Sequence, residues 1–282
     1  MRVMLIGSNG QLGTDLSSIL LQGAVGEDDF LPLRHLDMDV CDPNAIEDRM
    51  SRFQPDVVIS TAAYHRVDEC ERETQQAFMV NVVATRYLAE ACARHGATLA
   101  WFSTDFVFNG RTSRPYVEDD PVAPLSVYGC SKVAGEMVIR ATLDKHFIVR
   151  TSSLFGVAGS SGKGGNFVET IRTRLGRGDE LKVVDDLEMS PTYTMDLAQA
   201  VLETVSSQPY GTYHITNSGS CTWYDFACDI ARRIGFDPAA VGRQSASALS
   251  GARRPAYSVL GSSKRASLRP WQEALLAYLE ER

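Results

Sequence analysis

Apolar residues in the first half of the chain alternate between short continuous runs and longer stretches with helical spacing. Continuous apolar runs are typical of buried strands, and spacings of three to four residues are typical of helices with one buried face. The runs predict strands at Val3–Ile6, Phe30–Leu33, Asp56–Ser60, Leu99–Ser103 and Phe147–Arg150. The stretches between them predict helices at Gln11–Leu21, Asn44–Phe53, Glu73–His95 and Val127–Leu143. This alternation predicts an α/β protein with a Rossmann-type, doubly wound parallel sheet.

The pattern changes after Arg150. The stretch Gly156–Gly165 contains five glycines, which predicts a mobile loop over a site. Further helices are expected at Asn166–Leu175, Met195–Val205, Trp223–Ile234 and Trp271–Glu281, and strands at Leu181–Val184 and Tyr213–Ile215. We therefore expect a first domain over residues 1–152 and a smaller C-terminal α/β lobe over residues 153–282. Part of this lobe, about 176–205, is expected to return to the main sheet.

Composition narrows the class of protein. The 282 residues carry a net charge of −7, which argues against a nucleic-acid partner. The six cysteines form no CxxC pair and show no metal-type spacing with histidine, so we expect reduced thiols and predict no metal site. No apolar run reaches the roughly 18 residues that a membrane span needs. The first strand begins at Met1 or Arg2, which leaves no room for a signal peptide, so we expect a cytoplasmic protein.

Three glycines follow the first predicted strand at intervals of three residues: Gly7, Gly10 and Gly13. A turn without Cβ atoms lets a phosphate approach the backbone, and the start of a helix supplies free N–H groups and a favourable dipole. This order of strand, turn and helix is typical of sites that bind a dinucleotide pyrophosphate. Ala62 and Thr104 fall at the carboxyl ends of neighbouring predicted strands, where the ligands of such sheets bind.

A phenol and an ammonium group define the second motif. Tyr128 and Lys132 lie four residues apart, on one face of a predicted helix, and no other of the ten tyrosines has a lysine at this spacing. A neighbouring ammonium group is expected to lower the pKa of the phenol and make it a usable proton donor or acceptor. The strand before this helix ends in Ser103-Thr104-Asp105. The alternative is a surface pair on the helix and a strand end that merely caps a turn.

These motifs, in this order, resemble those of the extended short-chain dehydrogenase/reductases, and among them the dTDP-4-dehydrorhamnose reductase family. The resemblance runs along the whole chain through Gly10-Gln11-Leu12-Gly13, Ala62-Ala63-Tyr64, Ser103-Thr104-Asp105-Phe106-Val107-Phe108, Pro124-Leu125-Ser126-Val127-Tyr128-Gly129, Arg150-Thr151-Ser152, Gly165-Asn166-Phe167, Ser190-Pro191-Thr192 and Arg253-Arg254-Pro255. It implies an NAD(P)-binding domain over 1–152 and a substrate-binding lobe over 153–282. The implied activity is reduction of the 4-keto group of a nucleotide-diphospho-deoxysugar, as in dTDP-rhamnose biosynthesis, with dTDP-4-dehydro-L-rhamnose as the expected substrate.

The resemblance implies three catalytic residues. Tyr128 would protonate the C4 oxygen while the nicotinamide delivers hydride to that carbon. Lys132 would bond the nicotinamide ribose and tune Tyr128, and Thr104 would hold the same oxygen by a hydrogen bond.

The implied cofactor residues span the first domain. They comprise Gly7, Gly10, Gln11, Leu12 and Gly13 at the pyrophosphate, Asp39 and Val40 at the adenine, Ala62, Ala63, Tyr64 and Asn81 near the ribose and nicotinamide, and again Tyr128 and Lys132. Arg34 follows the second strand, where an arginine suits a 2′-phosphate and an acidic residue suits a free 2′-hydroxyl. Arg34 therefore favours NADPH, with NADH as the alternative.

Four residues are implied at the sugar nucleotide: Asp105, Ser153, Asn166 and Arg253. Ser153 departs from the family, whose typical members have tryptophan here, so the identity of the sugar is open. Some relatives hold Mg²⁺ at a dimer contact, and Asp15 could supply one carboxylate, but no ligand cluster can be read from the sequence. We expect a monomer or homodimer.

Three other functions are alternatives to a reductase. A dehydratase of the same superfamily needs an acidic residue after Asp105, where this chain has Phe106. A nucleotide-sugar epimerase uses the same tyrosine and lysine and stays open. An NADP-binding regulatory subunit, like the β subunit of methionine adenosyltransferase, would have no need of the phenol–ammonium pair.

Overall fold

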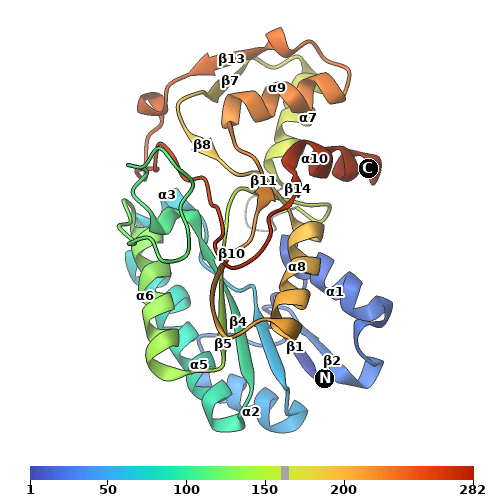
Figure 1. Ribbon diagram of the computed structural model, residues 1–282, viewed down its shortest axis with the longest axis vertical. Helices are drawn as coiled ribbons and strands as arrows, with labels where there is room; N and C mark the ends of the chain where they lie inside the picture. The colour runs from blue at the N-terminus through green and yellow to red at the C-terminus, as the bar shows by residue number, and fades with distance from the viewer. Residues whose placement is uncertain (160–164) are drawn as a thin grey trace.

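The computed structural model describes residues 1–159 and 165–282. Its centre is a six-stranded sheet with the order β10-β5-β4-β3-β1-β2, in which every neighbouring pair is parallel (Figure 1). The strands are β1 (Val3–Ile6), β2 (Phe30–Leu33), β3 (Val57–Ser60), β4 (Thr98–Thr104), β5 (His146–Thr151) and β10 (Gly211–His214). Strand order reverses between β1 and β3, the position where doubly wound sheets bind their ligands. The predicted fold class is confirmed.

Helices cover both faces of this sheet (Figure 1). One face carries α1 (Gln11–Ile19) and α8 (Thr194–Ser207), and the other carries α2 (Pro43–Phe53), α5 (Ala84–His95) and α6 (Val127–Thr142). Alternate residues of β1 enter the two cores: Val3 packs with the α1 side, whereas Met4 packs with the α5 side. This period of two is what a strand buried on both faces requires.

The long helix expected at Glu73–His95 is present but is not uniform. It consists of α4 (Thr74–Phe78), a π-helical turn at Met79–Val83, and α5, and it ends at Gly96 in the left-handed conformation with φ +72°. A π turn adds one residue to the helical ring and re-aims the side chains that follow it, and such turns are frequent at functional sites.

The second lobe has its own apolar core, which draws on residues from Phe155 to Leu279. Its helices are α7 (Phe167–Arg177), α9 (Trp223–Arg233) and α10 (Trp271–Glu280). Its strands pair as β6 (Leu154–Phe155) with β9 (Thr192–Tyr193), β7 (Leu181–Val184) with β13 (Val241–Gln244), β8 (Glu188–Met189) with β12 (Cys221–Thr222), and β11 (Asn217–Ser218) with β14 (Leu268–Pro270). A separate core supports the proposed division near residue 152.

The return of the chain to the main sheet differs from the expectation. Within 176–205, strand β7 pairs with β13 in the second lobe, and only helix α8 reaches the main sheet by packing on α1. The strand that joins the main sheet is β10, which pairs with β5. The central part of the predicted glycine-rich loop, 160–164, lies outside the described residues.

A crossing segment, residues 252–263, runs back from the second lobe to the first. Arg254 forms a two-pronged ion pair with Asp68 in α3 (Val67–Cys70), at 2.8 and 3.0 Å. Further along, Leu260 forms an isolated parallel β-bridge with Tyr116. The backbone N–H of Ser263 donates a hydrogen bond to the carboxylate of Glu118. The two lobes are therefore joined at both ends of this segment. No helix of the described chain is both long and apolar enough to cross a membrane.

Candidate active site

The glycine turn between β1 and α1 is held by close backbone contacts. Gly7 has φ +82°, and its N–H and that of Ser8 bond the carbonyl of Leu33 at 2.8 and 3.1 Å. A Cβ at Gly13 would lie 2.0 Å from the oxygen of Gly7, and a Cβ at Gly7 would lie 2.4 Å from Oγ1 of Thr61. Neither position can hold a side chain without moving the turn.

Gly10 is different, because its Cβ position meets only the oxygen of Gly7, at 3.2 Å. Gly10 caps the N-terminus of α1, no side chain bonds this end, and its first turn contains no acidic residue. The buried Nε2 of Gln11 has no hydrogen-bond partner in the described chain. Free backbone N–H groups, a positive helix end and an unpartnered amide donor together suit an anion such as a pyrophosphate. The residues present therefore fit the predicted dinucleotide.

Arg34 lies directly after β2, close to this turn. Its guanidinium binds both carboxylate oxygens of Asp37, at 2.8 and 3.0 Å, and this hydrogen bonding holds the pKa of Asp37 at about 2. More than half of the Arg34 side chain is exposed. Asp39 is also exposed and accepts a bond from the N–H of Cys41, whereas Val40 is buried. These residues thus line the edge of the sheet beside the turn.

Asn81 connects the loop after β3 with the helix of Tyr128. Ala62, Ala63 and Tyr64 in this loop are half-buried. The buried side chain of Asn81, inside the π turn, accepts a bond from the N–H of Tyr64 and donates to its carbonyl, at 2.9 and 3.0 Å. It also donates to Ser131, which donates to the carbonyl of Tyr128. Asn81, predicted at the cofactor, thus holds two parts of the site together.

Strand β4 ends in three buried polar side chains. The hydroxyl of Thr104 donates to Asp105 at 2.9 Å, and Ser152 donates to the other carboxylate oxygen, also at 2.9 Å. Burial raises the pKa of Asp105, and hydrogen bonds from Ser258, Ser152 and Thr104 oppose this rise. Both oxygens of Asp105 are therefore engaged by neighbouring side chains.

Tyr128 lies one residue inside α6, beside Thr104. Burial raises the pKa of Tyr128, and its hydrogen bond with Thr104 lowers it by less. The expectation that Lys132 would lower this pKa is therefore wrong for this structure. The reason is burial, which removes water from the phenolate and disfavours this charged form by more than the hydrogen bond with Thr104 favours it.

Lys132 is almost fully buried, and its ammonium nitrogen lies 3.6 Å from the centre of the Trp101 ring. Burial lowers the pKa of Lys132 to about 7, and the charge of Glu136 opposes this shift. Tyr128 and Lys132 do share one helix face, as predicted. The phenol–ammonium pair stays a prediction, and the contact found for the ammonium group is with the indole ring of Trp101.

The residues predicted at the substrate lie in three different environments. Ser153 has φ +48°, a left-handed conformation that is uncommon for a residue with a Cβ, and its carbonyl accepts a bond from Thr192. Arg253 is exposed at the start of the crossing segment. Asn166 is buried and caps α7: its amide bonds the N–H of Glu169, the carbonyl of Gly156 and the hydroxyl of Tyr278. Structural contacts thus occupy Asn166.

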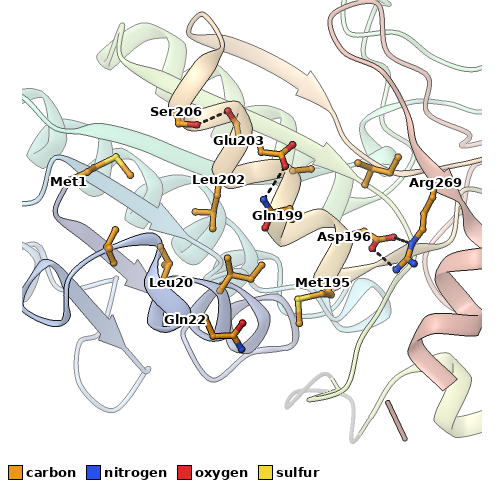
Figure 2. A pocket seen from close by; sticks show the side chains of 14 residues that line it. Met1, Leu20, Gln22, Met195, Asp196, Gln199, Leu202, Glu203, Ser206 and Arg269 are labelled. Carbon is orange, nitrogen blue, oxygen red and sulfur yellow. Dashed lines mark hydrogen bonds and ion pairs between the residues drawn. The ribbon is translucent and has the colours of Figure 1, made fainter. Parts of the chain in front are cut away.

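A metal site does not emerge from the described residues, in which no three His, Cys, Asp or Glu side chains gather. Asp15 is buried in α1, where desolvation raises its pKa and a hydrogen bond with Thr194 opposes the rise. A cavity of about 900 Å³ lies at the far end of α1 from the glycine turn, between α1 and α8 (Figure 2). Asp196 and Arg269 form an ion pair at its edge, at 2.7 Å, and its described lining includes none of the predicted site residues.

Three residues that shape this site are absent from the predicted set: Trp101, Ser131 and Ser152. Ser131 lies between Tyr128 and Lys132, and Ser152 lies in a quoted motif, so both were within reach of a motif-based search. Trp101 reads from the sequence as an ordinary core residue of a strand, because its contact with Lys132 depends on how β4 and α6 pack.

The chain is similar along its whole length to several known proteins. The whole chain, residues 1–282, matches the family described as the RmlD substrate binding domain. It is 40% identical to the spore coat polysaccharide biosynthesis protein SpsK of Bacillus subtilis, over 100% of this chain and 98% of that protein. A crystal structure of a dTDP-4-dehydrorhamnose reductase from Clostridium acetobutylicum superimposes with a TM-score of 0.92 at 36% identity, covering 100% of this chain and 99% of that chain. The Bacillus anthracis dTDP-4-dehydrorhamnose reductase, solved in complex with NADP, superimposes with a TM-score of 0.89 at 33% identity, covering 100% of this chain and 99% of that chain.

Proposed function

The chain belongs to the RmlD substrate binding domain family, and on this premise we propose that it is an NADPH-dependent reductase of a dTDP-4-keto-deoxysugar. The preferred substrate in this proposal is dTDP-4-dehydro-L-rhamnose, which is reduced to dTDP-L-rhamnose. The observation that carries the proposal is the placement of the Tyr128 hydroxyl beside Thr104, at the carboxyl end of β4, which is the edge of the parallel sheet where β1 also ends in the glycine turn.

Tyr128 is the proton donor in this proposal. Reduction of a ketone to an alcohol takes up one hydride at carbon and one proton at oxygen. The raised pKa of Tyr128 keeps the phenol protonated at neutral pH, which is the form that a donor to the C4 oxygen needs. Thr104 positions the phenol and, because its own hydrogen is directed to Asp105, acts as an acceptor in the resting site.

NADPH, when bound, supplies the hydride. The N–H groups of Gly10, Gln11, Leu12 and Gly13 would hold its pyrophosphate, with Gly7 shaping the turn. Arg34 would contact the 2′-phosphate, and Asp39 and Val40 would flank the adenine. Ala62, Ala63 and Tyr64 would line the ribose and nicotinamide, in a loop that Asn81 fixes in place.

The proposed substrate contacts are Asp105, Ser153 and Arg253, with Asn166 in a supporting role through the cap of α7. Arg253 is exposed and suits a diphosphate. A boundary between the cofactor domain and the substrate lobe near residue 152 is part of the proposal, as is a monomer or homodimer. So is a cytoplasmic location, which fits six free cysteines.

We do not favour an epimerase or a regulatory subunit, because the two solved relatives described above, which match the whole chain at 36% and 33% identity, are named as reductases. The deciding experiment mixes the protein with NADPH and dTDP-4-dehydrorhamnose and follows the absorbance of the reduced nicotinamide. We expect steady oxidation by the wild type and a loss of at least about 100-fold in kcat for Tyr128→Phe. The Tyr210→Phe variant, changed at an exposed tyrosine, is the control and should keep full activity. Equal rates for Tyr128→Phe and the wild type would reject Tyr128 as the donor.

A further inference from the structure

Lys132 is a buried cation without an ion-pair partner among the described residues. Its side chain is almost fully buried. Lys132 lies in α6, six residues after the N-cap Ser126. The charged group that acts on it is Glu136, one helical turn further along. Both carboxylate oxygens of Glu136 already accept hydrogen bonds, at 2.6 to 2.9 Å. Oε1 accepts from Ser103 and Arg150, and Oε2 accepts from Arg150 and Arg140. Glu136 is therefore committed to other partners.

Trp101 provides the contact that Glu136 does not. Its ring centre lies 3.6 Å from the ammonium nitrogen of Lys132, well within the distance at which a cation is attracted to an indole face. Trp101 is on β4, between Ser60 of β3 and Ile148 of β5, and it is 1% exposed. A desolvated cation over an indole is the strong form of this interaction.

The packing around the indole fixes its position. A Cβ at Gly135 of α6 would lie 2.8 Å from Cη2 of Trp101 and 2.5 Å from the carbonyl oxygen of Asn81. The absence of a side chain at Gly135 thus lets α6 lie directly on the ring. Sheet pairing on both sides of Trp101 and the contact with Gly135 leave the indole little freedom to turn away from Lys132.

We propose that Trp101 is a positioning residue for Lys132, whose ammonium group it holds against the indole face and keeps charged within the buried site. The contribution to catalysis rests on the proposed function, in which Lys132 binds the nicotinamide ribose beside Tyr128. In this proposal Trp101 acts through the lysine, whose ammonium group its ring contacts.

The test observes Lys132 directly by NMR, without turnover. The chain has five lysines, so ¹³C labelling of the lysine ε-carbons gives few signals, and Lys132→Arg identifies the one of interest. We expect the ε-protons of Lys132 in the wild type to be shifted upfield by the indole ring current. Trp101→Leu should abolish this shift and lower the pKa of Lys132 by roughly one unit, the effect of losing a tenfold preference for the cation.

Two variants separate the contact from general damage to the core. Trp101→Phe keeps an aromatic face, so it should retain part of the upfield shift and keep the pKa of Lys132 close to its wild-type value. Phe147→Leu removes a buried aromatic ring from the core on the opposite face of the sheet and should leave the Lys132 signal unchanged. Should Trp101→Leu not fold, the wild-type signal still decides: a Lys132 resonance at the position of an exposed lysine overturns the proposal.

Kinetics then connect the contact to the reaction. The pH profile of kcat/KM for NADPH oxidation should move to lower pH in Trp101→Leu, with a loss of about tenfold near neutral pH, and Trp101→Phe should recover most of it. An unchanged Lys132 resonance and profile in Trp101→Leu would refute the positioning role. Absence of turnover in the wild type, with the NMR result as expected, would instead refute the proposed function and leave the contact established.

Discussion

The side-chain amide of Asn81 donates a hydrogen bond to the hydroxyl of Ser131 at 2.9 Å and so ties a π turn to the helix of Tyr128 and Lys132. The same amide satisfies the backbone N–H and carbonyl of Tyr64. The loop after β3 and the catalytic helix therefore take their relative position from one buried side chain.

Replacing Asn81 by alanine should destabilise the protein and disturb the site together. The change leaves the N–H of Tyr64 without a partner and its carbonyl with only the long bond from the Cys70 thiol, which should cost about 3 kcal/mol in the free energy of unfolding. We expect a lower kcat as well, since Ser131 and Tyr128 lose their support. Urea denaturation and steady-state kinetics measure both effects. Gln76→Ala, at an exposed position of α4, should change neither, and a stable Asn81→Ala would contradict the assigned role.

The glycines of the turn should respond differently to alanine. Gly10→Ala adds a Cβ with only a 3.2 Å contact to Gly7, on the side open to a phosphate, so the protein should fold normally but bind NADPH at least about tenfold more weakly. Gly13→Ala places a Cβ 2.0 Å from the oxygen of Gly7 and should lower the melting temperature. Calorimetry and NADPH titration separate the two effects. Normal NADPH affinity in Gly10→Ala would place the pyrophosphate elsewhere.

Arg34 should determine the choice between NADPH and NADH. Arg34→Ala removes the charge available to a 2′-phosphate, so KM for NADPH should rise about tenfold while KM for NADH stays constant. Asp37→Asn releases the guanidinium from its carboxylate partner and should shift the preference further towards NADPH. Steady-state kinetics with both cofactors measure the ratio. Equal changes for the two cofactors would show that Arg34 does not distinguish them.

Glu118 should make stability depend on acid pH. Burial alone would raise its pKa, but hydrogen bonds from Ser262, Ser263 and His214 outweigh this and hold the pKa of Glu118 at about 2, below the ordinary 4.5. A carboxyl whose pKa is depressed by folding stabilises the protein above its unfolded pKa, and this stabilisation is lost as the pH falls from about 4.5 towards 2.

The variant Glu118→Gln should therefore be less stable than the wild type by about 3 kcal/mol near neutral pH, and the difference should shrink below pH ~4.5. Denaturation midpoints measured across this range provide the check. Asp119→Asn, at the exposed neighbouring position, serves as the control. A gap between Glu118→Gln and the wild type that is independent of pH would indicate lost packing rather than a titrating carboxylate.

The parts of this site that the sequence predicts are those with a local cause. Gly7, Gly10 and Gly13 act within one turn, and Tyr128 is placed by its helix, so spacing alone indicates their arrangement. The sheet and its helices follow in the same way from periodicity.

The rest depends on contacts between distant segments. Asn166 resembles a ligand-binding residue in its motif, yet its amide bonds Tyr278, 112 positions away. Lys132 lies over the ring of Trp101, which is distant in the sequence, because β4 and α6 pack closely at Gly135. The π turn at Asn81 leaves no mark in the apolar spacing of the long helix. Such contacts are set by tertiary packing, which overrides the local pattern.

The crossing segment makes the contacts between the two lobes depend on the order in which the chain is synthesised. Asp68 and Glu118 leave the ribosome well before Arg254 and Ser263, which bond them. A nascent chain can form β1 to β5 and dock its helices well before that point, but the carboxylates of Asp68 and Glu118 then lack these partners. Translation must therefore pass Ser263 before the crossing segment can bond both carboxylates, so a chain truncated before Arg254 should form the first five strands of the main sheet without these contacts between the lobes.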